Sequence, residues 1–310
     1  MDLIAQLKRV TANVGDDRDR YYLESIARVL ADIAGWKPAP REIPFELVDG
    51  FSMMGQIPIT RCFRDDTIIK INQSYDSVKI ELFLESILYT KDQVDGIIEM
   101  VRGRRTFHYG MTDTWLYQSF DRYPIAAKRV AVLGSGCPVY EAMCLALNAT
   151  PITVEYQIRI SDDDRLTFLS PEQFATGGFP VDAALAVSAF EHDGLGRYGD
   201  PLDPDGDLKA MANVAKVLPE GGLLYLTVPF QHDVTLWNVN RHYGPVRLPH
   251  LLKGFTLLDT FGPPDGLFLS LEPLVIDAEG WRRYFNELGP GSAPEWVLVL
   301  RNNKQGLSCV

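Results

Sequence analysis

Short apolar runs alternate with segments of helical periodicity over the C-terminal two-thirds of the chain. Apolar runs at Arg129–Leu133, Val181–Ser188 and Leu223–Val228 predict buried strands. Apolar positions at helical spacing predict helices over Val139–Asn148 and Asp207–Leu218. Further strands are predicted at Ile152–Glu155, Leu166–Leu169, Phe255–Asp259 and Trp296–Leu300. This alternation predicts an α/β fold in which helices cover both faces of a parallel sheet.

The N-terminal part of the chain lacks this alternation. Its expected elements are a helix within residues 1–35, a strand at Thr67–Ile71 and a helix at Ser77–Leu88. Residues 102–124 are rich in aromatic side chains, which favour a buried core over a binding platform. Any of them that faced a crevice could stack on a sugar or an aromatic substrate. We expect residues 1–125 to be a helical or mixed extension that packs, as a substrate-side platform, on an α/β domain of residues 126–310.

Composition and charge exclude several classes of protein. The formal net charge of the 310 residues is −11, which argues against binding to nucleic acid through a basic surface. No apolar run reaches the roughly 18–20 residues of a membrane-spanning helix, and the first residues lack a signal-peptide core. The four cysteines form no CxxC pair, so we expect neither a disulfide framework nor a zinc site. The cytoplasm is the expected compartment.

A glycine-rich turn follows the first predicted strand of the α/β region. Gly134, Ser135 and Gly136 allow the backbone to turn tightly and to approach a ligand. Glu155, at the end of the next strand, is placed to accept both hydroxyls of a ribose. Glu141 lies in the first turn of the intervening helix, where it either reaches the ligand or complements the helix dipole.

This element alone does not choose the cofactor. A nicotinamide-binding fingerprint would have a third glycine where Val139 stands, and typical methyltransferases would have one where Pro138 stands. The turn is therefore compatible with either nicotinamide or S-adenosylmethionine (SAM).

Two downstream segments resemble class I SAM-dependent methyltransferases. Residues 179–192 look like the fourth-strand segment of that family, which ends in an acid–histidine pair, and 211–229 resemble its next helix, turn and fifth strand. The resemblance covers about residues 128–260. It implies a Rossmann-like class I methyltransferase fold, a mostly parallel seven-stranded sheet flanked by helices, with SAM as cofactor. It also implies that Ser188, Phe190 and Glu191 join the cofactor site.

A narrower resemblance rests on the string EHDGLGRYGDPLDPDGD at residues 191–207. Together with residues 138–141 and 240–244, this string resembles a domain family of unknown function whose members are similar to methyltransferases. Bacterial members are often associated with surface-polysaccharide synthesis, so the resemblance implies a saccharide-related substrate.

Two histidines are candidate catalytic bases. An alcohol that attacks a methyl group must lose a proton, and imidazole titrates near neutral pH. His192 is the first candidate and His242 the second, the alternatives being a packing histidine beside the ligand and an ordinary loop histidine. The candidate substrate-contacting residues around them are Asp193, Arg197, Tyr198, Arg241 and Tyr243.

The aspartates of the 191–207 loop have two interpretations. They either contact a substrate or a divalent metal, or they belong to a capped turn in which Asp203 or Asp205 begins the following helix. No metal-ligand set is predicted, and metal is the less favoured alternative.

The leading hypothesis is a SAM-dependent O-methyltransferase that acts on a saccharide or another hydroxylated metabolite. The alternatives are a non-catalytic methyltransferase-like binding module and a nicotinamide-dependent oxidoreductase. We expect a small-molecule or glycan partner and no nucleic-acid or membrane partner, and a homodimer is compatible with the sequence.

Overall fold

A computed structural model describes most of the α/β region and parts of the N-terminal region. The described residues are 12, 15, 20, 23–27, 39–63, 87–157, 159–229, 232–262 and 295–304. The expected strand at Thr67–Ile71, most of the helix within 1–35 and most of the helix at Ser77–Leu88 lie outside these residues. Leu88 itself is not helical, because it begins the short strand β2 (Leu88–Tyr89).

Seven strands form the central sheet, in the order β11-β12-β8-β7-β3-β4-β6. They are β3 (Arg129–Leu133), β4 (Thr150–Val154), β6 (Thr167–Leu169), β7 (Ala183–Val187), β8 (Leu223–Thr227), β11 (Phe255–Phe261) and β12 (Val297–Asn302). Strands β3, β4, β6, β7 and β8 are parallel, and β12 runs antiparallel to both β8 and β11. This mostly parallel sheet confirms the predicted Rossmann-like class I methyltransferase fold.

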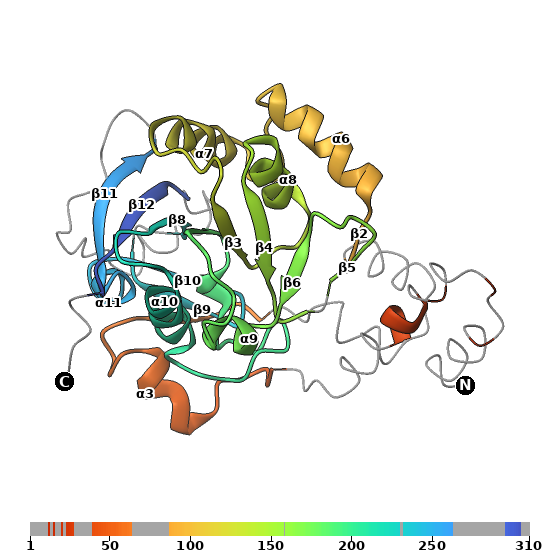
Figure 1. Cartoon of the computed structure of the whole chain (residues 1–310). Coiled ribbons are helices and arrows are strands. Elements are labelled where there is room, and N and C mark those ends of the chain that lie inside the picture. The colour runs from red at the N-terminus through yellow and green to blue at the C-terminus, as the bar shows by residue number, and fades with distance from the viewer. Residues whose placement is uncertain are drawn as a thin grey trace.

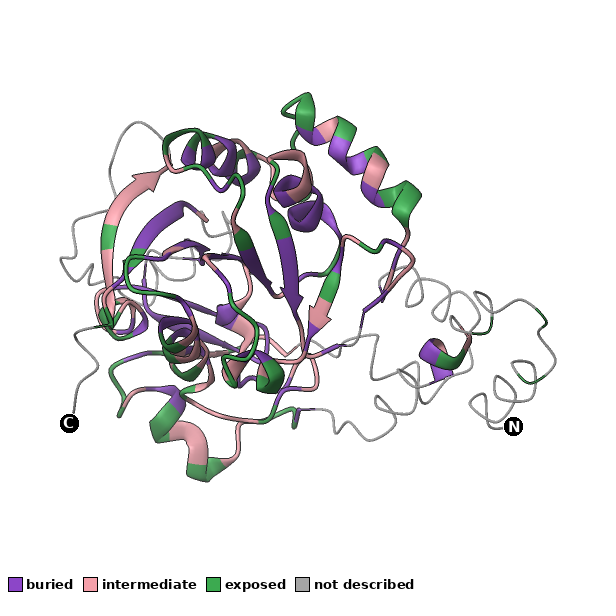
Figure 2. Cartoon of the chain, viewed as in Figure 1, coloured by how far each residue is buried: buried purple, intermediate pink, exposed green. Residues whose placement is uncertain are grey.

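Helices cover both faces of this sheet (Figure 1). One layer contains α6 (Lys91–Arg102), α7 (Met111–Arg122) and α8 (Val139–Ala146), and the other contains α9 (Pro171–Ala175), α10 (Gly206–Val217) and α11 (Leu248–Leu251). Successive strand residues feed opposite cores: Val130 and Val132 pack under the first layer, and Ala131 and Leu133 under the second. The strands in the middle of Figure 2 are largely buried. Because both faces of these strands are covered, their sequences are continuous apolar runs.

Helices α6 and α7 were not predicted, although they complete the first layer. Thr90 caps α6 by accepting a hydrogen bond from the Gln93 N–H at 3.2 Å, and the buried face of that helix packs with α8.

The aromatic residues of the segment 102–124 have two different roles. Tyr117 and Phe120 are buried in the core, whereas Tyr109, before α7, lines the cavity described below. The described end of the N-terminal region thus packs directly on the α/β domain.

A second, three-stranded sheet joins distant parts of the sequence. Strand β1 (Ile59–Arg61) pairs in parallel with β9 (Val234–Trp237), which pairs antiparallel with β10 (Asn240–His242). Strand β2 pairs in parallel with β5 (Ile160–Ser161). The remaining short helices are η1 (Phe45–Leu47), α3 (Val48–Phe51) and η2 (Phe190–His192).

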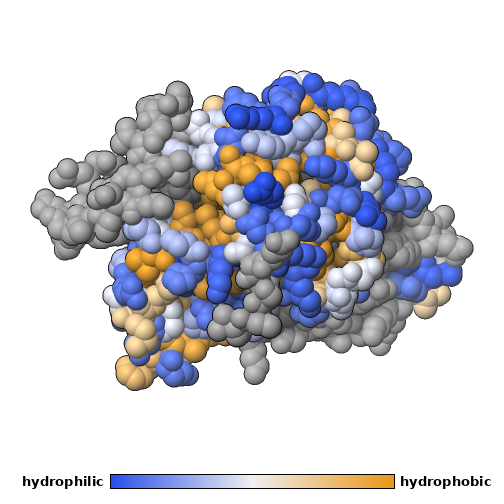
Figure 3. Space-filling model, turned by 60° about the vertical axis from the view of Figure 1, so that its left-hand side comes forward, coloured by the Kyte–Doolittle hydropathy of each residue, from blue (hydrophilic) through white to orange (hydrophobic). Residues whose placement is uncertain are grey.

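Hydrophilic residues cover much of the face shown in Figure 3, with apolar residues between them. Within the described part of the chain, every helix is too short or too polar to cross a bilayer.

Candidate active site

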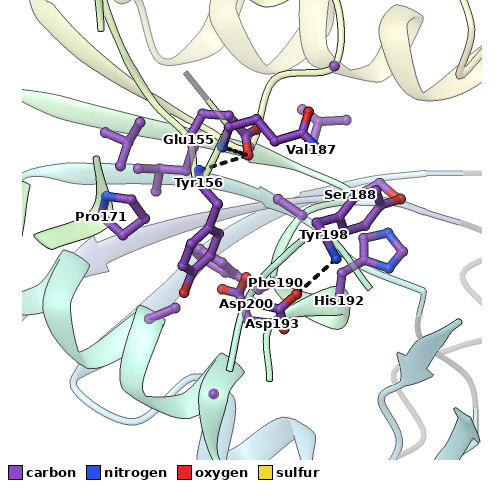
Figure 4. A pocket seen from close by; sticks show the side chains of 18 of the residues that line it. Glu155, Tyr156, Pro171, Val187, Ser188, Phe190, His192, Asp193, Tyr198 and Asp200 are labelled. Carbon is purple, nitrogen blue, oxygen red and sulfur yellow. Dashed lines mark hydrogen bonds between the residues drawn. The ribbon is translucent and has the colours of Figure 1, made fainter. Parts of the chain in front are cut away.

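A cavity of about 590 Å³ opens at the carboxyl ends of β3, β4 and β7. The strand order reverses beside β3, and this is the edge where open α/β sheets bind ligands. Figure 4 shows Glu155 and Tyr156 on one side of this space and His192 and Tyr198 on another. The cavity therefore brings together residues from both predicted motifs.

The two glycines of the turn serve different purposes. Gly134 has φ of +71°, and a Cβ there would lie 2.6 Å from the Cβ of Ala189, so the turn and the close packing against β7 require glycine. Gly136 lines the cavity, and a Cβ built on it would meet no described atom within 4 Å. The space beside Gly136 is therefore open to a ligand rather than filled by the protein.

Ser135 is buried between these glycines and anchors the turn from behind. Its carbonyl oxygen accepts hydrogen bonds from the Tyr89 hydroxyl at 2.8 Å and from Arg159 Nη2 at 2.6 Å. Tyr89 and Arg159 were not predicted, because they lie in the β2 and β5 segments outside the glycine motif. An arginine four residues after Glu155 was the only local signal for this support.

Glu155 lines the cavity, but its carboxylate also holds the turn. Its Oε2 accepts the Ser135 N–H at 2.9 Å, and its Oε1 accepts the Tyr156 N–H at 2.9 Å. Oε1 also accepts the Gln157 N–H at 3.4 Å. A carboxylate offers about four acceptor positions, so Oε2 retains one toward a ligand hydroxyl. Glu155 therefore has a structural role, and it lines the cavity in which it is predicted to bind a ligand.

Glu141 does not reach the cavity. It is fully buried, and its Oε1 accepts the Thr153 hydroxyl at 2.8 Å between α8 and β4. Burial raises the pKa of this carboxyl above its ordinary value. Pro138 also has a structural explanation: it is the N-cap of α8 at φ −77°, where a backbone N–H is not needed for the helix ladder.

Ser188 and the acid–histidine pair extend from β7 into η2. The Ser188 hydroxyl lies 2.5 Å from Glu191 Oε1, and Glu191 is fully buried behind the cavity wall. Phe190 and His192 line the cavity together with Ser188. Nδ1 of His192 lies 2.7 Å from the Val239 carbonyl oxygen, which requires a proton on Nδ1 and leaves Nε2 as the basic nitrogen of the neutral ring.

A buried ionic network closes the loop that follows. Nη1 of Arg241 donates to the Asp193 carbonyl oxygen at 2.6 Å, and Arg247 contacts both carboxylate oxygens of Asp207, at 2.8 and 2.5 Å. The Tyr243 hydroxyl lies 2.9 Å from Asp207 Oδ2. Burial opposes ionisation of Asp207, but the two guanidinium groups prevail and hold its pKa below the ordinary value. Arg241 and Tyr243, predicted to touch substrate, are thus buried outside the cavity lining, where they hold the loop.

The glycines of the 191–207 string allow the two ends of the loop to touch. A Cβ on Gly194 would lie 2.0 Å from the Asp203 carbonyl oxygen, and one on Gly206 would lie 2.7 Å from the Gly194 nitrogen. Asp203 Oδ1 accepts the Asp205 N–H at 3.0 Å, as expected for a turn before α10. Among the described residues, no group of His, Cys, Asp and Glu is arranged to hold a metal.

Two carboxyl groups of the loop have different surroundings. Asp200 accepts the Gly196 N–H at 2.8 Å and the Tyr198 N–H at 3.0 Å, so it stabilises the loop from within. Asp193 is half-buried and lines the cavity, and burial together with the charge of Asp200 raises its pKa well above the ordinary value. Tyr198 also lines the cavity, while Arg197 lies over the Tyr198 ring and donates to the Val239 carbonyl oxygen at 3.1 Å.

The second candidate base, His242, is not brought to the cavity. It is 1% exposed in β10 and is absent from the residues that line the described cavity. Burial, with a smaller effect from His232, lowers its pKa to about 4. The segment predicted as a catalytic loop is therefore a buried strand in the structure.

Residues outside the predicted site complete the cavity wall. Phe107 and Tyr109 belong to the aromatic segment that was expected mainly in the core, and they line the cavity together with His108 and Tyr156. Glu295, at the entrance to β12, lies behind Ser188, with its Oε1 3.0 Å from the Ser188 hydroxyl.

The chain is similar to one protein family and to several solved structures. Residues 127–280 match the family described as Caenorhabditis protein of unknown function, DUF268. No curated protein matches the chain. One similar solved structure is the 1,6-didemethyltoxoflavin-N1-methyltransferase of Burkholderia thailandensis with bound 1,6-didemethyltoxoflavin and S-adenosylhomocysteine, at 14% identity over 79% of this chain and 94% of that chain, with a TM-score of 0.44. Another is the N-methyltransferase NodS of Bradyrhizobium japonicum, at 12% identity over 62% of this chain and 94% of that chain, with a TM-score of 0.39.

The chain is similar to the DUF268 family over the segment that carries the glycine turn, the acid–histidine pair and the closed loop.

Proposed function

We propose that the protein is a SAM-dependent methyltransferase whose acceptor is a hydroxyl of a saccharide or another hydroxylated metabolite. The observation that carries this proposal is the open space beside Gly136, inside a cavity at the ligand-binding edge of a class I methyltransferase sheet. Glu155, Ser188 and Phe190 line the same cavity. These residues suit a cofactor that has ribose hydroxyls and an aromatic base. When bound, SAM supplies a methyl group on a positively charged sulfur.

The other wall of the cavity supports deprotonation of an acceptor. His192 is fixed by the Val239 carbonyl oxygen with its proton on Nδ1, so its Nε2 is the ring nitrogen that can accept a proton. Asp193 lines the cavity beside it. Tyr109 and Tyr198 add flat rings with polar edges, which suit the apolar and hydroxylated faces of a sugar. In this proposal His192 removes the hydroxyl proton.

Ligand-dependent thermal stability tests the cofactor assignment. SAM and S-adenosylhomocysteine should raise the melting temperature, whereas NAD and NADP should not, because a ligand at 100 times its Kd adds about 2.7 kcal/mol to the stability of the state that binds it. Stabilisation by NAD or NADP alone would instead favour an oxidoreductase. No stabilisation by any of the four would overturn the proposal.

Two glycine variants locate the binding site. Gly136→Val should abolish stabilisation by SAM, because the side chain would fill the open space beside the turn. Gly96→Val is the matched control, since a Cβ on exposed Gly96 in α6 also meets nothing within 4 Å but lies away from the cavity. Equal SAM binding by both variants would remove the glycine turn from the site.

A further inference from the structure

Two carboxyl groups from distant parts of the chain meet at one hydroxyl. The Ser188 Oγ lies 2.5 Å from Glu191 Oε1 and 3.0 Å from Glu295 Oε1. Glu295 Oε2 also accepts the Thr227 hydroxyl at 3.2 Å, and Glu191 Oε2 has no hydrogen-bond partner among the described residues. Neither carboxyl group is explained by the cofactor site or by packing.

The contacts of the Ser188 hydroxyl indicate how many protons the two carboxyl groups hold. The single hydrogen of the Ser188 hydroxyl can be donated to one carboxylate only, so the second short contact requires a proton on a carboxyl group. Burial and the nearby charge of Glu295 raise the pKa of Glu191 well above its ordinary value, and burial raises the pKa of Glu295 to about 7. The pair therefore holds at least one proton at neutral pH.

The pair is connected to the cavity by two residues that line it. Ser188 bridges the carboxyl groups, and Nε2 of His192 lies 3.6 Å from Glu191 Oε1. A proton accepted by His192 therefore has a short route to Glu191. The titratable groups that face the pair from the surrounding elements are Tyr109, Tyr140, His192, Asp193 and Tyr243.

We propose that Glu191 and Glu295 form a proton-holding pair, which keeps one shared proton beside a positively charged ligand and takes up a second when that charge is lost. This inference rests on the proposed function, because SAM is the positively charged ligand. During transfer, the carbon–sulfur bond breaks with its electron pair remaining on sulfur, and a lone pair of the acceptor oxygen forms the new bond to carbon. The acceptor's O–H bond breaks, and its proton passes to His192 and then to the pair.

In this proposal, the summed charge of the ligand sulfur and the carboxyl pair stays the same before and after methyl transfer. With SAM bound, a pair with one negative charge would balance the positive charge on sulfur. With the neutral thioether product bound, the pair would carry no charge. The carboxyl pair would thereby be spared an uncompensated charge both before and after the reaction. Glu295 acts in this account through Ser188 and Glu191, and it is a positioning residue that sets the charge of the pair.

Binding calorimetry in buffers of different ionisation enthalpy tests the inference without an acceptor. At pH 7, S-adenosylhomocysteine should bind with uptake of about half a proton more than SAM, because the pKa of Glu295 lies at about 7 and only SAM carries the extra positive charge. Glu295→Gln should bring this difference close to zero. Glu99→Gln, the same substitution on the exposed surface of α6, should leave it unchanged.

Two negative outcomes separate the inference from the function. If SAM and S-adenosylhomocysteine both bind with equal proton uptake, the pair does not respond to ligand charge and the inference is overturned, while the proposed function stands. If neither ligand binds, both are overturned.

Infrared titration of the wild-type protein avoids dependence on a variant that fails to fold. A protonated-carboxyl band should disappear with a midpoint near pH 7 in the unliganded protein, and SAM should move that midpoint downward while S-adenosylhomocysteine should not. The absence of any band that titrates near this pH would overturn the shared proton.

Discussion

The two walls of the cavity are built in different ways. On one wall, Gly134–Gly136 and Glu155 follow one another through a single strand–helix–strand unit, and the Ser135 N–H meets the Glu155 carboxylate directly. On the other wall, the 191–207 loop depends on Arg241 and Arg247 from a separate part of the chain. Under the proposed function, the first is the cofactor wall and the second the acceptor wall. The cofactor wall is formed mainly by neighbours in the chain, with Tyr89 as a remote support, whereas the acceptor wall needs two arginines from a later segment of the chain.

The strongest test of this difference is to break the network that closes the loop. Asp207→Asn should destabilise the protein by about 3–5 kcal/mol, because it leaves the buried guanidinium groups of Arg241 and Arg247 without their carboxylate. Asp205→Asn, two residues earlier and exposed, should change stability little. Chemical denaturation of both variants measures the effect, and equal stabilities would show that the network does not hold the loop.

Measurements of kcat and of the Kd for SAM should also distinguish the two walls. His192→Asn should lower turnover roughly a hundredfold, about 2.7 kcal/mol of transition-state stabilisation, with SAM affinity nearly unchanged. Exposed His250 on α11 supplies the control variant His250→Asn. The measurement is kcat with any acceptor that supports turnover, alongside the Kd for SAM. A parallel loss of SAM affinity would place His192 on the cofactor wall.

Low pH should lower the stability of the protein through His242 in β10. Burial lowers the pKa of His242 from 6.5 to about 4, so the unfolded chain binds more protons than the folded protein between these values. Stability is fully present above pH 6.5 and falls as the pH drops toward 4, by about 2 kcal/mol between pH 7 and pH 5 from this group. His242→Gln should flatten this part of the stability profile, measured by denaturation at each pH. An unchanged slope would assign the acid sensitivity to other groups.

The smallest predicted effect concerns the cofactor wall. Glu155→Gln keeps an oxygen acceptor but removes the charge, so SAM affinity should fall about tenfold, or about 1.4 kcal/mol. The amide has one oxygen where the carboxylate has two, so it can accept from the Ser135 N–H or the Tyr156 N–H but not from both. A modest loss of protein stability should therefore accompany the loss of affinity. Calorimetric titration with SAM measures the affinity, and full wild-type affinity would leave Glu155 with its structural role alone.

The same contrast explains which parts could be predicted from the sequence. Strand β3 occupies the predicted residues Arg129–Leu133, because a strand buried on both faces must be continuously apolar. The glycine turn and Glu155 were recognisable because their chemistry depends on short spacing along the chain. Both lie on the cavity, as expected for a local motif.

The acceptor wall contains the residues that local patterns could not place. Arg241 and Tyr243 have side chains typical of a substrate site. They are buried, Arg241 through the pairing of β10 with β9 and Tyr243 beside Asp207. Glu295 stands in a segment with no motif, and it reaches Ser188 because β12 lies next to β8 in the sheet. Such positions depend on sheet order, which hydrophobic periodicity does not encode.

The position of β12 has a consequence for synthesis on the ribosome. β12 is made after every other strand of the seven-stranded sheet, yet it lies between β8 and β11 and not at an edge. Until Val297–Asn302 has emerged, β8 has an open edge and Glu295 cannot meet Ser188. Domains begin to fold as the nascent chain appears, so the glycine turn can form while the carboxyl pair is still missing. A nascent chain arrested before β12 would therefore have the glycine turn without the contact between Glu295 and Ser188, and would expose an unpaired strand edge to neighbouring chains.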